Sequence, residues 1–351
     1  MPDAPPVIKT VFPDSFIGQT PCSFSTILPL WYVPSIFREC NRKIPGGLLM
    51  LFTAIQPMLL TLKWDAFDDD RYIFEPKWDG WRVLLHKQGE RVSAYTKNGH
   101  VITDKFPEAI SAASAVSLHE AILDCEGICM RGGRPVFDDF AWRGRLADPN
   151  KIRQATQTHP ATFVAFDLLY NGQDLTGSEL MERKARLHDA LRPSDLLTPT
   201  LYIEGQGTAL KKLSEQQHLE GIVGKRKTSR YQQGVRSEDW IKVKNWQEID
   251  CIILGYRIAP PFALVLGLHF RTVKFKPVGT VELGFKPEEK QAFHEIAERL
   301  HTTRDSKTQW IEPRLCCHIQ YLERTDTHHL RHATFRGFLF EKNPDDCWWT
   351  Y

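Results

Sequence analysis

The sequence predicts an α+β protein of two domains, in which sheets and a few helices are followed by a small β-barrel. Its 351 residues are enough to build two hydrophobic cores. Short apolar runs with an alternating pattern dominate the chain, and helical periodicity is confined to a few segments. Beyond residue 249, five short strand-like runs and a helical segment follow within about 100 residues, which is typical of a small barrel.

Composition narrows the class of protein. Apolar residues make up 42% and charged residues 25%, as in ordinary soluble proteins, and no run reaches the roughly 18 apolar residues of a membrane span. We therefore expect no membrane partner. The net charge of +2 does not identify a nucleic-acid partner, although basic residues cluster at 225–230 and 242–244. The eight cysteines contain no Cys-x-x-Cys pair, which argues against a zinc site and agrees with a reducing cytoplasm.

Residues 1–49 are rich in proline and aromatic residues and lack the basic start and continuous apolar stretch of a signal peptide. We expect them to form a poorly ordered extension, and a natural start near Met50 is left open. The first domain is expected over residues 50–248 and the second over 249–351.

The elements are expected in the following order. In the first domain, alternation predicts strands at 72–77, 82–87, 91–95, 121–128, 162–170, 220–226 and 239–244, with turns at Gln88-Gly89 and 97–99. Apolar periodicity and proline placement predict helices at 106–116, 179–191 and 210–219. In the second domain, strands are expected at 249–256, 263–270, 278–284, 315–322 and 335–340, with a helix at 287–300. Such a domain is typical of the oligonucleotide-binding type of barrel.

The segment Glu-Pro-Lys-Trp-Asp-Gly-Trp-Arg at 75–82 places Lys77 at the corner between two strands. A lysine that attacks phosphorus must first lose its proton, and an ordinary lysine pKa near 10.4 prevents this at neutral pH. Burial or neighbouring cations would have to lower the pKa of Lys77. Arg82 adds a guanidinium that suits phosphate or ribose. The alternative interpretation is a solvent-exposed turn lysine.

Two further strands carry paired charges. Period-two alternation places Asp124 and Glu126 on one face, where two carboxylates on a mostly buried strand need a cation or a donor. This pattern indicates a magnesium or ribose contact, or alternatively a pair of surface acids. Lys242 and Lys244 also share a face, and they repel each other unless an anion such as a triphosphate lies between them.

Lys-x-Asp-Gly-x-Arg at 77–82 resembles the nucleotidyl-lysine motif of ATP-dependent DNA ligases, RNA ligases and mRNA-capping enzymes. Later segments resemble further ligase motifs in the same order: Leu-Asp-x-Glu at 123–126, the aromatic strand around Phe166, Glu-Gly-Ile-Val-x-Lys at 220–225 and Trp-Ile-Lys-x-Lys at 240–244. Segments 310–313 and 330–337 resemble the C-terminal module of bacterial end-joining ligases. The resemblance implies a nucleotidyltransferase (ATP-grasp-like) adenylation domain followed by an OB-fold barrel.

The resemblance also implies roles for individual residues. Lys77 would be the catalytic nucleophile that takes AMP from ATP. The implied ATP site consists of Glu75, Arg82, Lys97, Glu126, Phe166, Lys242 and Lys244, and the implied metal site for Mg²⁺ or Mn²⁺ consists of Glu220 and Glu126. Phe166 is expected to stack on adenine. Lys97 stands where the family usually has arginine, so the charge is kept but the bidentate fork is lost.

The last family motif typically reads Arg-x-Asp-Lys, whereas this chain has Leu339-Phe340-Glu341-Lys342. Lys342 is retained and Glu341 is a close substitute. The arginine that is thought to orient the leaving pyrophosphate is absent at Leu339. We therefore expect either slow self-adenylylation or substitution by Arg336.

The function implied by the resemblance is that of an ATP-dependent DNA ligase. It would seal 5′-phosphate/3′-hydroxyl breaks in nicked or broken duplex DNA through lysyl-AMP and DNA-adenylate. A monomer is expected in a bacterial-type cytoplasm, associated with the nucleoid, with end-joining or repair proteins as partners. Two alternatives stay open: an RNA ligase or capping-type nucleotidyltransferase, and a catalytically weakened binder of nicked DNA. NAD is disfavoured because the resemblance is to the ATP branch.

Overall fold

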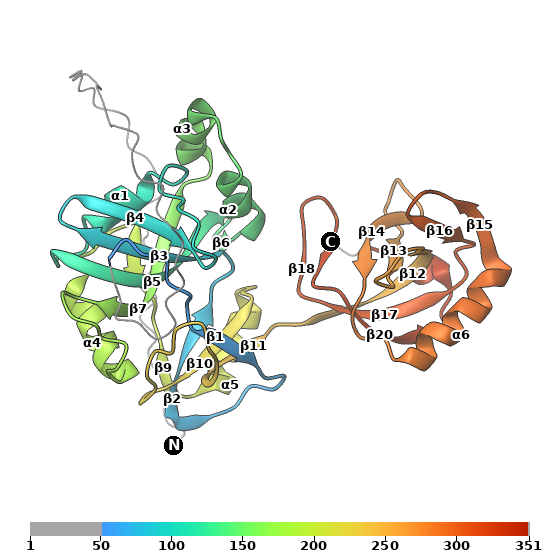
Figure 1. The fold of residues 1–351 in the computed structure, drawn as a ribbon. Coiled ribbons are helices and arrows are strands. Elements are labelled where there is room, and N and C mark those ends of the chain that lie inside the picture. The colour runs from blue at the N-terminus through green and yellow to red at the C-terminus, as the bar shows by residue number, and fades with distance from the viewer. Residues whose placement is uncertain (1–50, 350–351) are drawn as a thin grey trace.

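The computed structural model describes residues 51–349, so the expectation for residues 1–49 lies outside the described part of the chain. Figure 1 shows two bodies, one of sheets and helices and one of a curled sheet, joined where the chain passes from β11 (Arg236–Lys244) to β12 (Gln247–Arg257). The predicted α+β class is confirmed. None of the described helices is long and apolar enough to cross a lipid bilayer.

The first body contains two sheets. In one sheet the strand order is β1 (Leu59–Leu62), β11, β10 (Gly221–Arg226), β2 (Asp69–Lys77) and β9 (Ile203–Gly205). In the other it is β4 (Arg91–Thr96), β3 (Trp81–Gln88), β5 (Glu120–Arg131), β7 (Ala161–Tyr170) and β8 (Leu197–Pro199), with β6 (Arg134–Pro135) paired to β5. The chain passes from one sheet to the other between Lys77 and Trp81, so the corner predicted at Lys77 joins the two sheets.

Hydrophobic side chains pack in layers around these sheets. Ile73 and Trp240 of the first sheet pack with Leu84, Ile122 and Leu169 of the second. On the outer face of the first sheet, Leu210 of α5 (Gly207–Gln216) packs in a cluster that includes Val243, with Ile241 on its border. Trp240 and Ile241 therefore lie on opposite faces of β11, as strand alternation requires. The outer face of the second sheet packs against α1 (Glu108–Ala113) and α2 (Phe137–Gly144).

The second body is a curled sheet with its own core. Its strand order is β14 (Lys276–Val281), β13 (Leu264–Leu268), β12, β16 (Thr308–Ile311) and β15 (His301–Arg304), while β17 (Cys316–Tyr321) pairs with both β12 and β20 (Thr334–Leu339). The double pairing of β12 curls the sheet around a core that includes Leu264, Phe293 and Phe335. The helix α6 (Pro287–Ala297) closes it, as the sequence predicts. A ribbon of β18 (Glu323–Arg324) and β19 (Leu330–Arg331) extends from this barrel.

Several elements differ from the sequence prediction. The helix expected at 106–116 is shorter, Glu108–Ala113, and the strand expected at 278–284 lies at Lys276–Val281. The helices α2 and α3 (Pro149–Thr158) were not predicted. Only Ala155 of α3 is buried, so this helix has almost no apolar stripe to detect. The helix α4 (Leu180–Ala190) and the hairpin between β3 and β4 agree with the prediction.

Candidate active site

Lys77 is the last residue of β2, and the antiparallel register sets it opposite Gly221, the first residue of β10. Glu220, the residue before β10, therefore lies beside Lys77, and one of its carboxylate oxygens accepts a hydrogen bond from Lys77 Nζ. Lys244 Nζ lies 3.0 Å from the other oxygen of Glu220. The side chain of Lys77 is 18% exposed and that of Glu220 6%. Lys77 is therefore not a solvent-exposed turn residue.

The corner after Lys77 requires glycine at position 80. A Cβ atom added to Gly80 would lie 2.1 Å from the carbonyl oxygen of Gly127 on β5, closer than real Cβ contacts come. The absence of a side chain lets the corner press against the neighbouring strand. The glycine of the motif is thus required because any larger side chain at position 80 would clash with β5. This close approach fixes the position of Lys77 relative to the second sheet.

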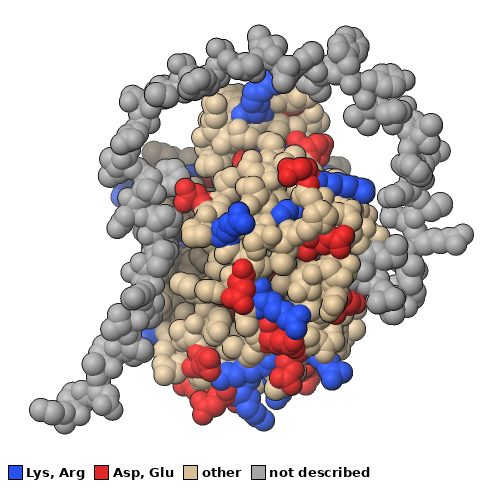
Figure 2. All heavy atoms as spheres, turned by 90° about the vertical axis from the view of Figure 1, so that its left-hand side faces the viewer, with Lys and Arg blue, Asp and Glu red and all other residues tan. Residues whose placement is uncertain are grey.

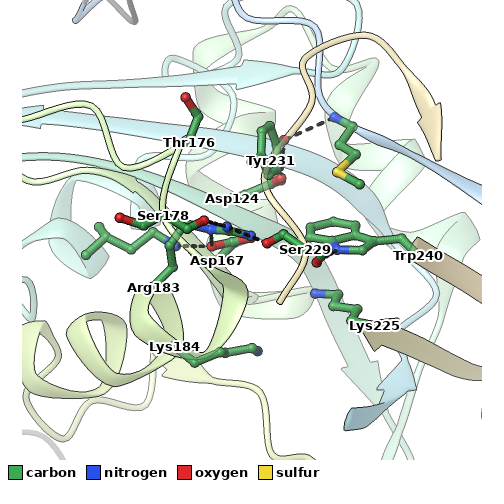
Figure 3. Close-up of polar contacts among 12 residues, drawn as sticks. Asp124, Asp167, Thr176, Ser178, Arg183, Lys184, Lys225, Ser229, Tyr231 and Trp240 are labelled. Carbon is green, nitrogen blue, oxygen red and sulfur yellow. Dashed lines mark hydrogen bonds and ion pairs between the residues drawn. The ribbon is translucent and has the colours of Figure 1, made fainter. Parts of the chain in front are cut away.

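Arg82 of β3 is held by the second sheet. Its Nε donates to Asp124 Oδ1 at 2.6 Å and its Nη2 donates to Asp124 Oδ2, so the pair is bidentate. The hydroxyl of Tyr231 donates to Asp124 Oδ2 at 2.6 Å (Figure 3). Burial lowers the pKa of Arg82, but the charge of Asp124 more than offsets this and raises it overall. Asp124 is fully buried and pairs with Arg82. The donor that this carboxylate was expected to need is therefore the Arg82 guanidinium.

A pocket of about 410 Å³, partly open to solvent, lies next to these residues. Its lining includes Glu75, Lys77, Arg82, Glu126, Phe166, Lys225 and Trp240. The Arg82 guanidinium lies 4.8 Å from the centre of the Phe166 ring, and Lys225 Nζ lies 4.4 Å from it. An aromatic ring, an acidic and basic rim and the Lys77 amine thus surround one cavity.

Glu126 and Glu220 set the charge around Lys77. Burial raises the pKa of Glu126 to about 8, against the opposing charges of Lys77 and Arg82. Burial alone would lower the pKa of Lys77, but the carboxylates of Glu220 and Glu126 raise it overall. The expectation that neighbouring cations lower the pKa of Lys77 is wrong for this arrangement, because acidic side chains are its nearest charged neighbours.

The other residues of the implied site are distributed unevenly. Lys242 is half-buried, and burial followed by the charges of Lys244 and Lys77 lowers its pKa, as expected for lysines that share a face. Lys97 is exposed in the turn after β4 and is not part of the pocket lining. In the barrel, Lys342 Nζ lies 2.9 Å from Asp250, and Glu341 is exposed. The structure therefore does not bring Lys97, Glu341 or Lys342 to the pocket.

Arg336 and Arg331 reach from the barrel to the first body. The Arg336 guanidinium lies 4.9 Å from the Trp64 ring, and Arg336 also donates to Gln320. Arg331 Nη1 donates to Asp79, two residues from Lys77, at 3.0 Å. Arg331 was not singled out from the sequence, because nothing in a single sequence shows which residue meets Asp79.

Both bodies of the chain match a known protein family. Residues 56–244 match the model of the ATP dependent DNA ligase domain, and residues 262–342 match that of the ATP dependent DNA ligase C terminal region. The Bifunctional non-homologous end joining protein LigD of Bacillus subtilis is 30% identical over 291 residues, which cover 78% of this chain and 47% of that protein. The Multifunctional non-homologous end joining protein LigD of Mycobacterium bovis is 28% identical over 315 residues, 84% of this chain and 40% of that protein. The chain thus spans less than half the length of these curated relatives.

Among solved structures, a mycobacterial DNA ligase D complexed with ATP and MES is 27% identical, with a TM-score of 0.51. The match covers 85% of this chain and 99% of that one. A structure of a Lig E DNA ligase has a TM-score of 0.57 at 15% identity and supports the fold alone. The expected combination of a nucleotidyltransferase domain and an OB-fold barrel is confirmed.

Proposed function

This chain belongs to the ATP-dependent DNA ligase family, and we propose that it seals breaks in duplex DNA with ATP through an AMP adduct on Lys77. The observation that carries the proposal is the position of the Lys77 amine. It lies in the lining of a pocket that also contains Phe166, and it is in contact with Glu220. A lysine nucleophile, an aromatic platform and flanking cations are the groups that nucleotidyl transfer needs.

In the first step, Lys77 Nζ attacks the α-phosphorus of ATP. An N–P bond forms, the P–O bond to the β-phosphate breaks and pyrophosphate leaves. Glu220 is the acceptor in contact with the proton that Nζ must lose. Phe166 supports the adenine ring, while Arg82, fixed by Asp124, binds the ribose or the α-phosphate. Lys244, which contacts the same Glu220 carboxylate as Lys77, and Lys242, on the same strand β11, bind the leaving phosphates.

A divalent cation fits Glu220 and Glu126. The two carboxylates are close enough that the charge of Glu220 raises the pKa of Glu126, which is the situation that a cation relieves. The described residues offer no set of three or more metal-ligating side chains, so phosphate oxygens of ATP would complete the coordination. Bound Mg²⁺ or Mn²⁺ would neutralise the carboxylates that hold the Lys77 proton and would stabilise the charge that develops on the phosphates.

In the later steps, an oxygen of the 5′-phosphate of the broken strand attacks the adenylyl phosphorus, a P–O–P bond forms and the N–P bond to Lys77 breaks. The 3′-hydroxyl then attacks that phosphate, a phosphodiester bond forms and AMP leaves. The barrel would hold the duplex against the pocket, with Arg331 and Arg336 close to the crossing point between the two bodies.

Figure 2 shows one face of the molecule, and wherever described residues are visible on it, basic and acidic side chains are interspersed. This mixed charge does not favour binding of a phosphate backbone to that face.

The test is a sealing assay on a nicked duplex with ATP and Mg²⁺, read on a denaturing gel. Full-length product is expected from the wild type and none from Lys77→Arg, and omission of either ATP or Mg²⁺ should abolish the product. A matched nicked RNA duplex should be sealed more slowly; faster RNA sealing would favour an RNA ligase. Binding of nicked DNA without sealing would favour the alternative of a catalytically weakened binder. The presence of Leu339 in place of the motif arginine is what suggests this alternative.

Because the LigD relatives are end-joining proteins by name, we propose blunt and short-overhang duplex ends as further substrates.

A further inference from the structure

Two cysteine side chains of the barrel touch each other beneath its surface. Cys316 is the first residue of β17, and Cys347 follows the short 3₁₀ helix η2 (Pro344–Asp346). Their Sγ atoms lie 3.7 Å apart, the two residues are 2% and 1% exposed, and both are free thiols. A disulfide bond needs about 2.05 Å between the sulfur atoms, so an approach of less than about 2 Å would allow one to form.

The backbone holds both sulfur atoms in place. On one side, Cys316 pairs with Ile252 of β12 and with Leu339 of β20, so that it lies between two strands of the sheet. On the other side, the backbone N–H of His269 donates to the carbonyl oxygen of Cys347 at 2.8 Å. The two thiols are therefore kept in contact by the fold, and a reaction between them is effectively intramolecular.

The two thiols differ in acidity. The hydrogen bond between them lowers the pKa of Cys316, against the effect of burial, and it raises the pKa of Cys347 together with burial. Because the thiolate is the nucleophile in thiol oxidation, Cys316 is the cysteine that reacts first and Cys347 the one that attacks afterwards. The adjacent Cys317 differs from Cys316, since burial raises its pKa well above the ordinary value.

The pair lies close to the surface of the barrel. Arg314, two residues before Cys316, is exposed, and so are Asp346 and Trp348, which flank Cys347. The charge of Lys342, a residue with an exposed fraction of 32% at its side chain, favours the thiolate form of both cysteines. Thiols near the surface and near a cation are those that small oxidants modify.

We propose that Cys316 and Cys347 are a redox modification site, which a hydroperoxide converts reversibly into an intramolecular disulfide. With hydrogen peroxide, the Cys316 sulfur attacks one oxygen, an S–O bond forms, the O–O bond breaks, and the leaving hydroxide takes the thiol proton as water. The Cys347 sulfur then attacks the Cys316 sulfur, an S–S bond forms, the S–O bond breaks, and a second water leaves with the Cys347 proton. Both cysteines are oxidised and the peroxide is reduced, and an external dithiol reverses the bond by exchange.

The bridge would close the segment 316–347, which carries both Arg331 and Arg336, the barrel residues in contact with the first body. A cross-link of this kind restricts the unfolded chain more than the folded one. The oxidised protein should therefore unfold at a higher urea concentration than the reduced protein. A midpoint that is unchanged or lower would show that the folded barrel does not accommodate the bond, and would overturn the proposal.

The covalent bond itself is tested by peptide mapping of the full chain. The protein is treated with hydrogen peroxide, its remaining thiols are alkylated in denaturant, and it is digested with trypsin without reduction. Cys316 then lies in the peptide 315–324 and Cys347 in the peptide 343–351. We expect these two peptides to be linked, at about 2 Da below their summed mass, and to separate after treatment with dithiothreitol.

The serine variants Cys316→Ser and Cys347→Ser should each abolish the linked pair of peptides. Cys317→Ser, at the adjacent buried cysteine, is the matched control and should retain it. If a serine variant does not fold, alanine at the same position gives the same comparison, and fragmentation of the wild-type peptide between positions 316 and 317 assigns the bond without any variant.

Alkylated thiols at both Cys316 and Cys347 after the peroxide treatment would overturn the proposal. A linked pair that persists in Cys316→Ser would do the same, as would sulfinic acid on Cys316 in place of the bridge. Because the measured product is a bond between two side chains of the barrel, a protein that forms no AMP adduct on Lys77 still gives a decisive result. Failure of this site and failure of the proposed function are therefore distinguishable.

Discussion

Asp124→Asn tests whether Arg82 is held in the pocket by a buried ion pair. Asp124 is fully buried, Arg82 is 13% exposed at its side chain, and the two share a bidentate contact that Tyr231 extends. Removing one charge from such a pair leaves a buried cation without compensation, which costs about 3–5 kcal/mol. Because a domain of this kind is stable by only about 5–15 kcal/mol, the loss should be obvious in urea unfolding followed by tryptophan fluorescence.

The double variant Arg82→Met/Asp124→Asn separates stability from function. It removes both charges, and the amide oxygen at position 124 can still accept the hydroxyl proton of Tyr231. We expect it to regain at least about 2 kcal/mol of the lost free energy of unfolding, because the uncompensated cation is gone. It should nevertheless form no AMP adduct, since Arg82 is proposed to bind the nucleotide. An Asp124→Asn protein within about 1 kcal/mol of the wild type, or a double variant no more stable than the single one, would refute this reasoning.

Two further predictions use the same chain. Phe166→Leu should raise KM for ATP roughly 5- to 150-fold, because stacking on a base contributes about 1–3 kcal/mol. Phe166→Tyr keeps the aromatic ring and should stay near the wild type in initial rates of adduct formation. Equal KM values for Phe166→Leu and the wild type would contradict the stacking role. Burial lowers the pKa of His86 from 6.5 to about 3, so as pH falls below 6.5 the unfolded chain takes up the proton before the folded one does. The free energy of unfolding of the wild type should therefore fall by up to ~5 kcal/mol between pH 6.5 and 3. His86→Gln should reduce this slope of stability against pH. The control His119→Gln, at an exposed histidine, should leave the slope unchanged. An unchanged slope in His86→Gln, measured by urea unfolding at several pH values, would contradict this.

The sequence alone predicted those features of the site that depend on the order of residues along one strand or motif. The corner at Lys77 and the shared face of Asp124 and Glu126 both follow from the strand pattern, and the structure agrees. The register between β2 and β10 then places Glu220 against Lys77, although the two are far apart in the chain. Motif order predicted that they belong to one site, but not that they form a direct ion pair.

Contacts that depend on the tertiary fold were not predictable. Lys184 lies on a helix whose pattern indicates packing only, and its contact with Glu75 depends on how α4 docks on the sheet. The raised pKa of Lys77 was also missed, since sequence shows which charges exist but not which are nearest. The same holds for Arg331, which meets Asp79 only because the barrel lies beside the first body.

The role of Lys77 as nucleophile is tested by the intact mass of the protein after incubation with ATP and Mg²⁺, followed by peptide mapping. We expect a gain of one adenylyl group per chain, located on Lys77, labile to acid as a phosphoramidate is, and absent from Lys77→Arg. An adduct on another residue, or one of undiminished amount in Lys77→Arg, would contradict the claim that this amine is the nucleophile.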